Sequence, residues 1–198
     1  LLNNNCKIII VACNTATTNA IKVLRATYDI PFIGIEPAIK PAALQTKTQK
    51  IGILATQGTL NSALFHQTVA LYSDVKVVEQ IGYELVQLIE SGAMHSEKMT
   101  QLLKDYLLPM VAEGIDYLVL GCTHYPLMEQ VFKDALGPAV QVYSQARLVS
   151  ESLADYLDRH PSMLGAGQQS RFITTGNPRQ VSDNATRFLK REITFDLL

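Results

Sequence analysis

Ile8-Ile9-Ile10-Val11-Ala12-Cys13-Asn14-Thr15 decides the fold class, because an apolar run gives way to polar residues at a cysteine. A similar stretch, Tyr117-Leu118-Val119-Leu120-Gly121-Cys122-Thr123-His124, occurs in the second half of the chain. In both, an apolar strand ends at a small residue, and a cysteine and side chains able to cap a helix follow. Two similar βα units that face one another would place two thiols across one cleft.

The wider pattern alternates short apolar runs with longer amphipathic segments, which is typical of βα units on a largely parallel sheet. Helical spacing of apolar residues is clearest in Met99–Val111 and Leu148–Leu157. The two prolines in Glu36–Pro41 indicate either a crossover between lobes or the first turn of a helix. Pro161–Gln169 is predicted to be a surface loop. The expected strands are Lys7–Ala12, Pro31–Ile35, Lys50–Ala55, Val75–Glu79, Tyr117–Gly121, Val140–Tyr143 and Arg171–Thr175.

Composition excludes several classes of protein. The chain has 198 residues, 17 basic against 18 acidic, so its balance does not favour a nucleic-acid or membrane-surface partner. The apolar runs are too short to span a bilayer. Three cysteines, without a visible signal peptide, do not form the disulfide framework of a small secreted protein and favour the cytoplasm.

Cys13 and Cys122 stand where open α/β sheets bind ligands, beyond the carboxyl ends of strands. A helix N-terminus there would stabilise a thiolate, and its free N–H groups would hold a substrate carboxylate. One alternative interpretation is that both are buried structural cysteines. Another is a metal site of Cys13, Cys122 and His124, although the paired spacing of structural zinc ligands is lacking. Cys6 lacks this context and is taken as incidental.

At these motifs the chain resembles the glutamate racemases. Val11–Ala16 and Gly121–Pro126 resemble the two catalytic motifs of that family. Gly34–Ala42, Gly52–Thr59 and Phe172–Gly176 are similar to further family segments, so the resemblance spans nearly the whole chain.

The resemblance implies a racemase without pyridoxal phosphate or any other cofactor, which interconverts L- and D-glutamate and supplies the D isomer to peptidoglycan. By the family's pattern, Cys13 would deprotonate D-glutamate and Cys122 would deprotonate L-glutamate, a two-base form of general acid–base catalysis. His124 would assist Cys122, and Glu90 would be an accessory carboxylate. The substrate-binding positions implied in the same way are Asn14, Thr15, Thr56, Thr59 and Thr123.

Local interpretations of these side chains stay open beside the implied roles. Thr56 and Thr59 would serve equally as a helix N-cap. His124 could cap a helix or donate to a backbone carbonyl, and Glu90 could be a solvated residue at a helix end.

The resemblance implies an α/β fold of two similar lobes, each a mostly parallel sheet flanked by helices, with the active site in the cleft between them. Residues 1–36 plus 145–198 would form the first lobe and 37–144 the second. Two departures qualify the match. The family's Asp-Ser turn and Pro-Tyr-Gly segment do not occur before Cys13, so we expect an N-terminally truncated member with little activity alone. Val142–Ala146 lacks the Asp that the family more often has near Tyr143.

Two other functions remain as alternatives. An aspartate or other amino-acid racemase of the same superfamily would also use two cysteines, but Ala16-Thr17 after the first motif and His124 after the second favour glutamate. A non-catalytic binding protein on this scaffold is disfavoured because both cysteines are present. The expected partners are glutamate and a second copy of the chain in a homodimer.

Overall fold

The computed structural model describes residues 1–165 and 170–198. The strands are β1 (Ile9–Val11), β2 (Phe32–Gly34), β3 (Lys50–Ala55), β4 (Lys76–Ile81), β5 (Tyr117–Gly121), β6 (Gln141–Ser144), β7 (Ile173–Thr174) and β8 (Asp196–Leu197). The helices are α1 (Asn14–Thr27), α2 (Ile39–Gln45), α3 (Gln57–Leu60), α4 (Ala63–Ala70), α5 (Leu85–Glu90), α6 (Glu97–Ala112), α7 (Glu129–Leu136), α8 (Ala146–Arg159) and α9 (Pro178–Leu189). Three short 3₁₀ helices, η1 (Leu2–Asn4), η2 (Tyr125–Met128) and η3 (Pro161–Met163), complete the described part of the chain.

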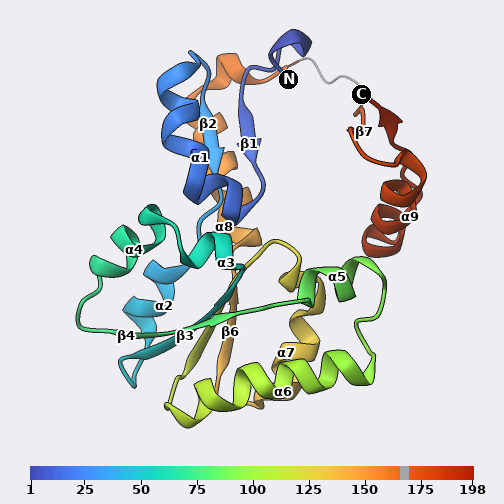
Figure 1. Cartoon of the computed structure of the whole chain (residues 1–198). Helices are drawn as coiled ribbons and strands as arrows, with labels where there is room; N and C mark the ends of the chain where they lie inside the picture. The colour runs from blue at the N-terminus through green and yellow to red at the C-terminus, as the bar shows by residue number, and fades with distance from the viewer. Residues whose placement is uncertain (166–169) are drawn as a thin grey trace. The chain divides into compact units, whose positions relative to one another are not determined.

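Every strand pair in the described residues is parallel, as the βα alternation predicted. β1 pairs with β2, the order β4-β3-β5-β6 forms a four-stranded sheet, and β7 pairs with β8 (Figure 1). Each strand expected from the sequence is present, with ends shifted by a few residues. The two-residue strand β8 was not predicted, because a strand of that length carries no recognisable periodicity.

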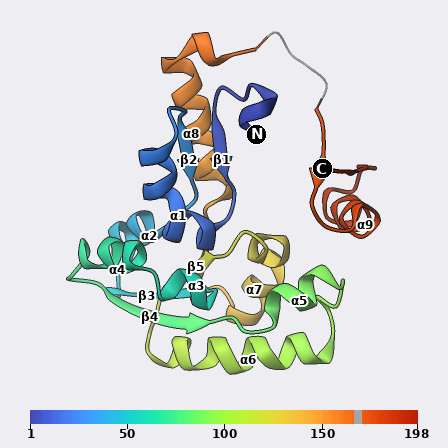
Figure 2. The ribbon, with the colours of Figure 1, turned by 45° about the horizontal axis from the view of Figure 1, so that its top comes forward.

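The core lies around the two central strands of the four-stranded sheet. Almost every residue of β3 and β5 is buried, since helices cover both faces of the sheet and leave no polar side to alternate with an apolar one. In Figures 1 and 2, α6 lies along one side of this sheet and α4 on the other. Ile51 and Ile53 of β3, Val119 of β5, Ile39 of α2 and Phe65 of α4 pack in one cluster.

The predicted helical segments are confirmed. The apolar stripe of Met99–Val111 forms the inner face of α6, which begins at the N-cap Ser96. Leu148–Leu157 lies within α8. The helix interpretation of Glu36–Pro41 is confirmed, because Pro41 stands in the first turn of α2. The segment also connects β2 to the four-stranded sheet, and its role as a crossover between lobes stays a prediction.

By compactness the chain divides into two units, Leu1–Arg159 and His160–Leu198. These two units do not test the predicted lobe boundaries, which stay a prediction. Within the second unit, the Phe195 amide donates to Ser182 Oγ at 2.9 Å, and the rings of Phe172 and Phe195 lie 5.5 Å apart. Of the predicted loop Pro161–Gln169, the last four residues lie outside the described part. No helix that the structure describes is long and apolar enough to cross a membrane.

Candidate active site

Cys13 starts α1 in an unexpected way. It is itself the N-cap residue, with extended backbone angles, and its Sγ accepts from the Ala16 amide at 3.5 Å. The prediction that polar side chains after the cysteine would cap this helix is wrong, because Asn14, Thr15 and Thr17 are already helical. Thr17 instead donates to the Val11 carbonyl at 3.1 Å and accepts from the Ile35 amide at 3.0 Å, which holds α1 against β1 and β2. The exposed Cys13 thiol is thereby held at a helix N-terminus.

Three threonine hydroxyls gather beside this helix start. Thr15 Oγ1 lies 2.6 Å from Thr56 Oγ1 and 3.1 Å from Thr59 Oγ1, and the latter two lie 3.1 Å apart. Thr56 occupies the N-cap position of α3, but its side chain makes no capping bond, so the simple N-cap interpretation fails for this hydroxyl. The Asn19 side chain adds a second link between α1 and α3 by donating to the Gly58 carbonyl at 2.9 Å. The cluster thus joins α1, which follows β1, to α3, which follows β3 of the other sheet.

Asn14, directly after Cys13, is buried with its amide unused. Asn14 is 2% exposed, and neither Nδ2 nor Oδ1 of its side chain has a hydrogen-bond partner among the described residues. A buried amide without partners costs free energy, and such groups in native proteins call for a ligand or another partner. Asn14 therefore offers one donor and one acceptor beside the Cys13 thiol.

Cys122 heads a chain of three side chains. It follows β5 and is buried, and its Sγ lies 3.9 Å from His124 Nδ1. His124 Nε2 lies 3.0 Å from Glu90 Oε1, at the end of α5. With the proton on Nε2 and donated to Glu90, Nδ1 is free to accept from the thiol. The structure thus brings Glu90 to Cys122 and His124, although Glu90 and His124 lie 34 positions apart in the sequence.

Thr123 does not cap the helix after Cys122, contrary to expectation. The turn continues for two residues before η2, and His124 takes the N-cap position without a side-chain capping bond. Thr123 is half-buried in that turn.

Burial is the main influence on the Cys122 thiol, and it raises the pKa. The backbone amides of His124 and Tyr125 act in the opposite direction, while the negative charges of Cys13 and Glu90 raise the pKa further. Cys13 and Cys122 therefore lie close enough for their charges to interact. A negative charge on Cys13 therefore favours Cys122 in its protonated form, which suits proton donation by Cys122.

The residues found outside the prediction are Tyr125 and Gly82. The Tyr125 hydroxyl donates to the Gly82 carbonyl at 3.3 Å, between the Cys122 turn and the end of β4. The sequence shows an aromatic residue, Tyr125, three positions after Cys122. A single aromatic residue in a predicted turn does not indicate whether its ring is buried, so Tyr125 was not predicted as a site residue.

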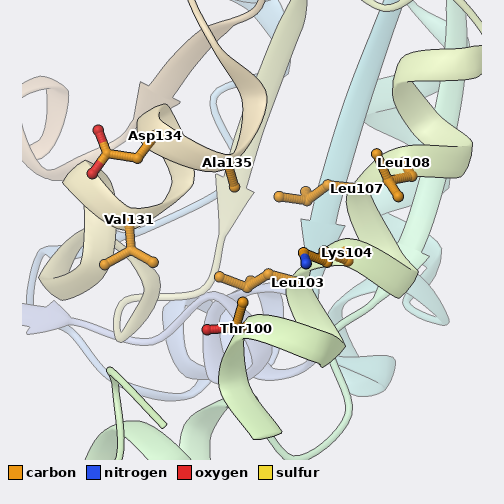
Figure 3. A pocket seen from close by; sticks show the side chains of 8 residues that line it. All are labelled: Thr100, Leu103, Lys104, Leu107, Leu108, Val131, Asp134 and Ala135. Atoms are coloured by element: carbon orange, nitrogen blue, oxygen red, sulfur yellow. The ribbon is translucent and has the colours of Figure 1, made fainter. Parts of the chain in front are cut away.

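In the described part of the chain, the predicted site residues belong neither to a candidate metal site nor to the groove between α6 and α7. Across residues 1–165 and 170–198, no three His, Cys, Asp or Glu side chains form a group that could hold a metal ion. A groove of about 600 Å³ runs between α6 and α7 and contains none of the predicted site residues (Figure 3). It is lined by Thr100, Leu103, Lys104, Leu107, Leu108, Val131, Asp134 and Ala135.

Known proteins are similar to this chain in sequence and in fold. The family described as Asp/Glu/Hydantoin racemase matches residues 1–150. A glutamate racemase from Ralstonia nicotianae is 39% identical over 179 residues, which cover 89% of this chain and 65% of the relative. The chain thus spans just under two thirds of that relative's length.

Two solved structures are similar over nearly all of this chain. A glutamate racemase isoform from Bacillus anthracis has a TM-score of 0.83 at 34% identity, covering 97% of this chain and 73% of that one. Escherichia coli glutamate racemase, solved with L-glutamate and the activator UDP-MurNAc-Ala, has a TM-score of 0.81 at 28% identity, covering 97% and 74%.

Proposed function

Since this chain belongs to the Asp/Glu/Hydantoin racemase family, we propose that the protein carrying it interconverts L- and D-glutamate with Cys13 and Cys122 as acid and base. The observation that carries the proposal is the position of two free thiols just after strands of two different sheets, with α1 and α3 held together at the threonine hydroxyls. Relatives named glutamate racemase, in sequence and in structure, support glutamate as the substrate.

The reaction balances without any cofactor. The Cys13 thiolate takes the α-proton of D-glutamate, the C–H electron pair passes into the carboxylate, and an S–H bond forms. The Cys122 thiol then gives its proton to the opposite face of the α-carbon, which leaves L-glutamate and a Cys122 thiolate. Burial, which raises the pKa of Cys122, favours the protonated form that this step requires.

His124 and Glu90 serve the reaction that starts from L-glutamate, in which Cys122 must be the base and Cys13 a thiol. When both sulfurs are protonated as L-glutamate binds, His124 Nδ1 accepts the Cys122 proton, and the Glu90 carboxylate at Nε2 stabilises the imidazolium that results. The Cys122 thiolate then takes the α-proton, and the Cys13 thiol donates its proton to the opposite face.

The substrate anchor in this proposal is polar and uncharged. The hydroxyls of Thr15, Thr56 and Thr59 donate to a carboxylate, and the unused Asn14 amide provides a further donor. Fixed donors of this kind stabilise the negative charge that develops on the carboxylate as the α-proton leaves. Thr123 completes the predicted substrate contacts.

The proposal is tested by circular dichroism of L-glutamate incubated with the protein. Cys13→Ala and Cys122→Ala should each slow racemisation by about 10²–10⁴-fold, the usual contribution of one acid–base group. Cys6→Ala is the matched control and should keep the wild-type rate, since Cys6 belongs to neither motif. Normal racemisation by either site variant would refute the two-thiol mechanism. Faster turnover of aspartate than of glutamate would identify aspartate as the substrate.

The wider setting follows from the same proposal. D-glutamate formed here would supply peptidoglycan synthesis, and the three free cysteines suit the reducing cytoplasm. We also predict a homodimer, which light scattering of the purified protein would reveal.

A further inference from the structure

Tyr125 is one of the most deeply buried side chains of the protein, with no exposed surface. Its ring packs against Phe132 of α7 with centroids 6.1 Å apart. Its backbone amide donates to the Cys122 carbonyl at 3.2 Å, which closes the turn that follows the cysteine. One residue thus connects the Cys122 turn to the core.

The hydroxyl of Tyr125 reaches a second segment of the site. It donates to the carbonyl of Gly82, the first residue after β4. Glycine is required there, because a Cβ at position 82 would lie 2.3 Å from the Tyr125 hydroxyl oxygen. The next residues, Tyr83 and Glu84, lead directly into α5, whose last residue is Glu90.

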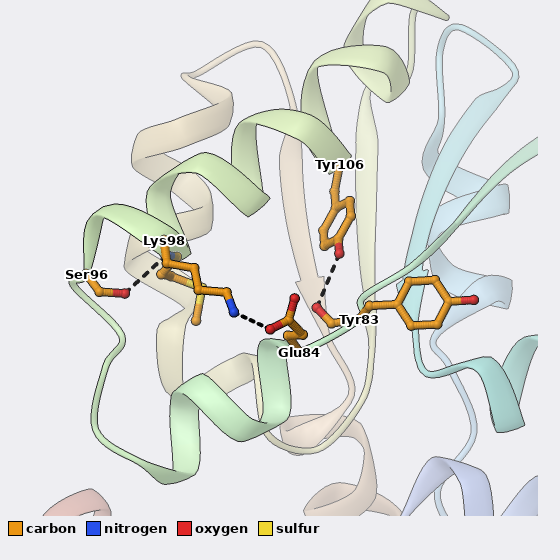
Figure 4. Close-up of polar contacts among 6 residues, drawn as sticks. Tyr83, Glu84, Ser96, Lys98 and Tyr106 are labelled. Atoms are coloured by element: carbon orange, nitrogen blue, oxygen red, sulfur yellow. Dashed lines mark hydrogen bonds and ion pairs between the residues drawn. The ribbon is translucent and has the colours of Figure 1, made fainter.

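The segment around Gly82 is itself fixed on α6 (Figure 4). The Tyr106 hydroxyl donates to the Tyr83 carbonyl at 3.2 Å, and Lys98 forms an ion pair with Glu84. The Tyr125–Gly82 hydrogen bond therefore links a turn that carries Cys122 and His124 to an anchored loop that leads to Glu90.

We propose that Tyr125 is a positioning residue, whose hydroxyl bond to Gly82 holds Cys122, His124 and Glu90 in line and keeps the turn's backbone amides directed at the sulfur. This inference rests on the proposed function. Tyr125 does not touch the substrate in this role, and it acts only through Cys122 and the α5 side of the site.

Electrostatics agrees with the geometry. Burial and the nearby Cys122 charge raise the pKa of the Tyr125 phenol well above its usual range, so the hydroxyl remains a donor at every working pH. The amides of His124 and Tyr125 lower the pKa of Cys122 against the effect of burial. The other titratable groups that act on Cys122 are Cys13, Glu90 and His124, and Tyr106 acts on Tyr125.

The test is Tyr125→Phe in the complete protein, which removes the hydroxyl and keeps the ring. Alkylation of Cys122 by iodoacetamide, followed by peptide mass spectrometry over a pH series, should shift to higher pH. The value of kcat should fall by about ten- to one hundred-fold with KM little changed, the range expected when a reacting group is misplaced. Tyr117→Phe is the control, because that buried hydroxyl contacts Gln45 instead and should affect neither measurement.

A second variant addresses the same contact from the other side. Gly82→Ala would push the Tyr125 ring away and should shift the Cys122 alkylation profile in the same direction. If Tyr125→Phe lowered only the thermal midpoint and left the alkylation profile and kcat unchanged, the positioning role would be overturned. The alkylation profile needs no substrate, so a shift in a protein that does not racemise glutamate would sustain the positioning role and reject the proposed function.

Discussion

Cys13 and Cys122 follow similar sequence motifs but have different surroundings. Cys13 is exposed at the start of α1, whereas Cys122 is buried behind a turn and contacts His124. Because the thiolate is the reactive form of cysteine, burial affects both the access to a thiol and its state of charge. The two sulfurs are therefore chemically distinguishable without any substrate present.

We expect iodoacetamide to modify Cys13 faster than Cys122 at neutral pH. Burial raises the pKa of Cys122 above its ordinary value, so this thiol should react appreciably only at a higher pH than an ordinary thiol. The raised pKa also affects stability. Because the pKa of Cys122 is higher in the folded than in the unfolded protein, the protonated thiol favours the folded protein at neutral pH, and this contribution is lost as the pH rises through the folded-state pKa. Peptide mass spectrometry checks the rates, with urea-unfolded protein as the control. Equal rates in the folded protein would contradict the prediction.

Glu90→Gln isolates the charge of the accessory carboxylate. The His124 and Glu90 side chains are 33% and 51% exposed, and a pair so exposed contributes up to about 1 kcal/mol. That corresponds to a loss of kcat of up to about fivefold. Glu113→Gln, at the end of α6 and paired with Lys76 at a similar exposure, should leave kcat unchanged. A loss beyond one hundredfold would show that Glu90 handles the proton itself.

At the scale of single elements, local sequence predicted most of the structure. β3 and β5 are nearly continuous apolar runs, and such a run is sufficient to predict a buried parallel strand. The N-terminus of α1 was not predictable, because cysteine is a weak acceptor and three better capping residues follow it. Thr15 and Thr17 bond other partners once the helix packs between β1, β2 and α3, while the Asn14 side chain bonds none among the described residues.

Ser96→Ala tests the element with the clearest cap. Ser96 Oγ accepts from the Met99 amide at 3.1 Å at the start of α6, and losing such a bond costs about 1 kcal/mol. Urea unfolding should show this decrease in the free energy of unfolding with an unchanged slope. Ser96→Asp keeps an acceptor at the N-cap and should stay near wild type. If both variants unfolded alike, the cap would not be the cause.

At the scale of the whole molecule, the part of the site that sequence alone did not predict is the contact between Thr15, Thr56 and Thr59. Thr15 lies 41 and 44 positions from its two partners, and the hydroxyls meet only because α1 packs against α3. No local pattern encodes a contact between elements of different sheets. Glu90 was placed only through a resemblance, since its own segment resembles any solvated helix end.

This contact predicts how ligand binding stabilises the protein. If the three hydroxyls hold a glutamate carboxylate, D-glutamate at about one hundred times its Kd should add about 2.7 kcal/mol to the free energy of unfolding and raise the thermal midpoint. Thr15→Val keeps the shape of the side chain but removes one hydroxyl, so the shift at a fixed glutamate concentration should shrink. Thr27→Val, at the far end of α1 where the hydroxyl bonds the Val23 carbonyl, is the matched control. An equal shift in both variants would remove the threonine cluster from the glutamate site.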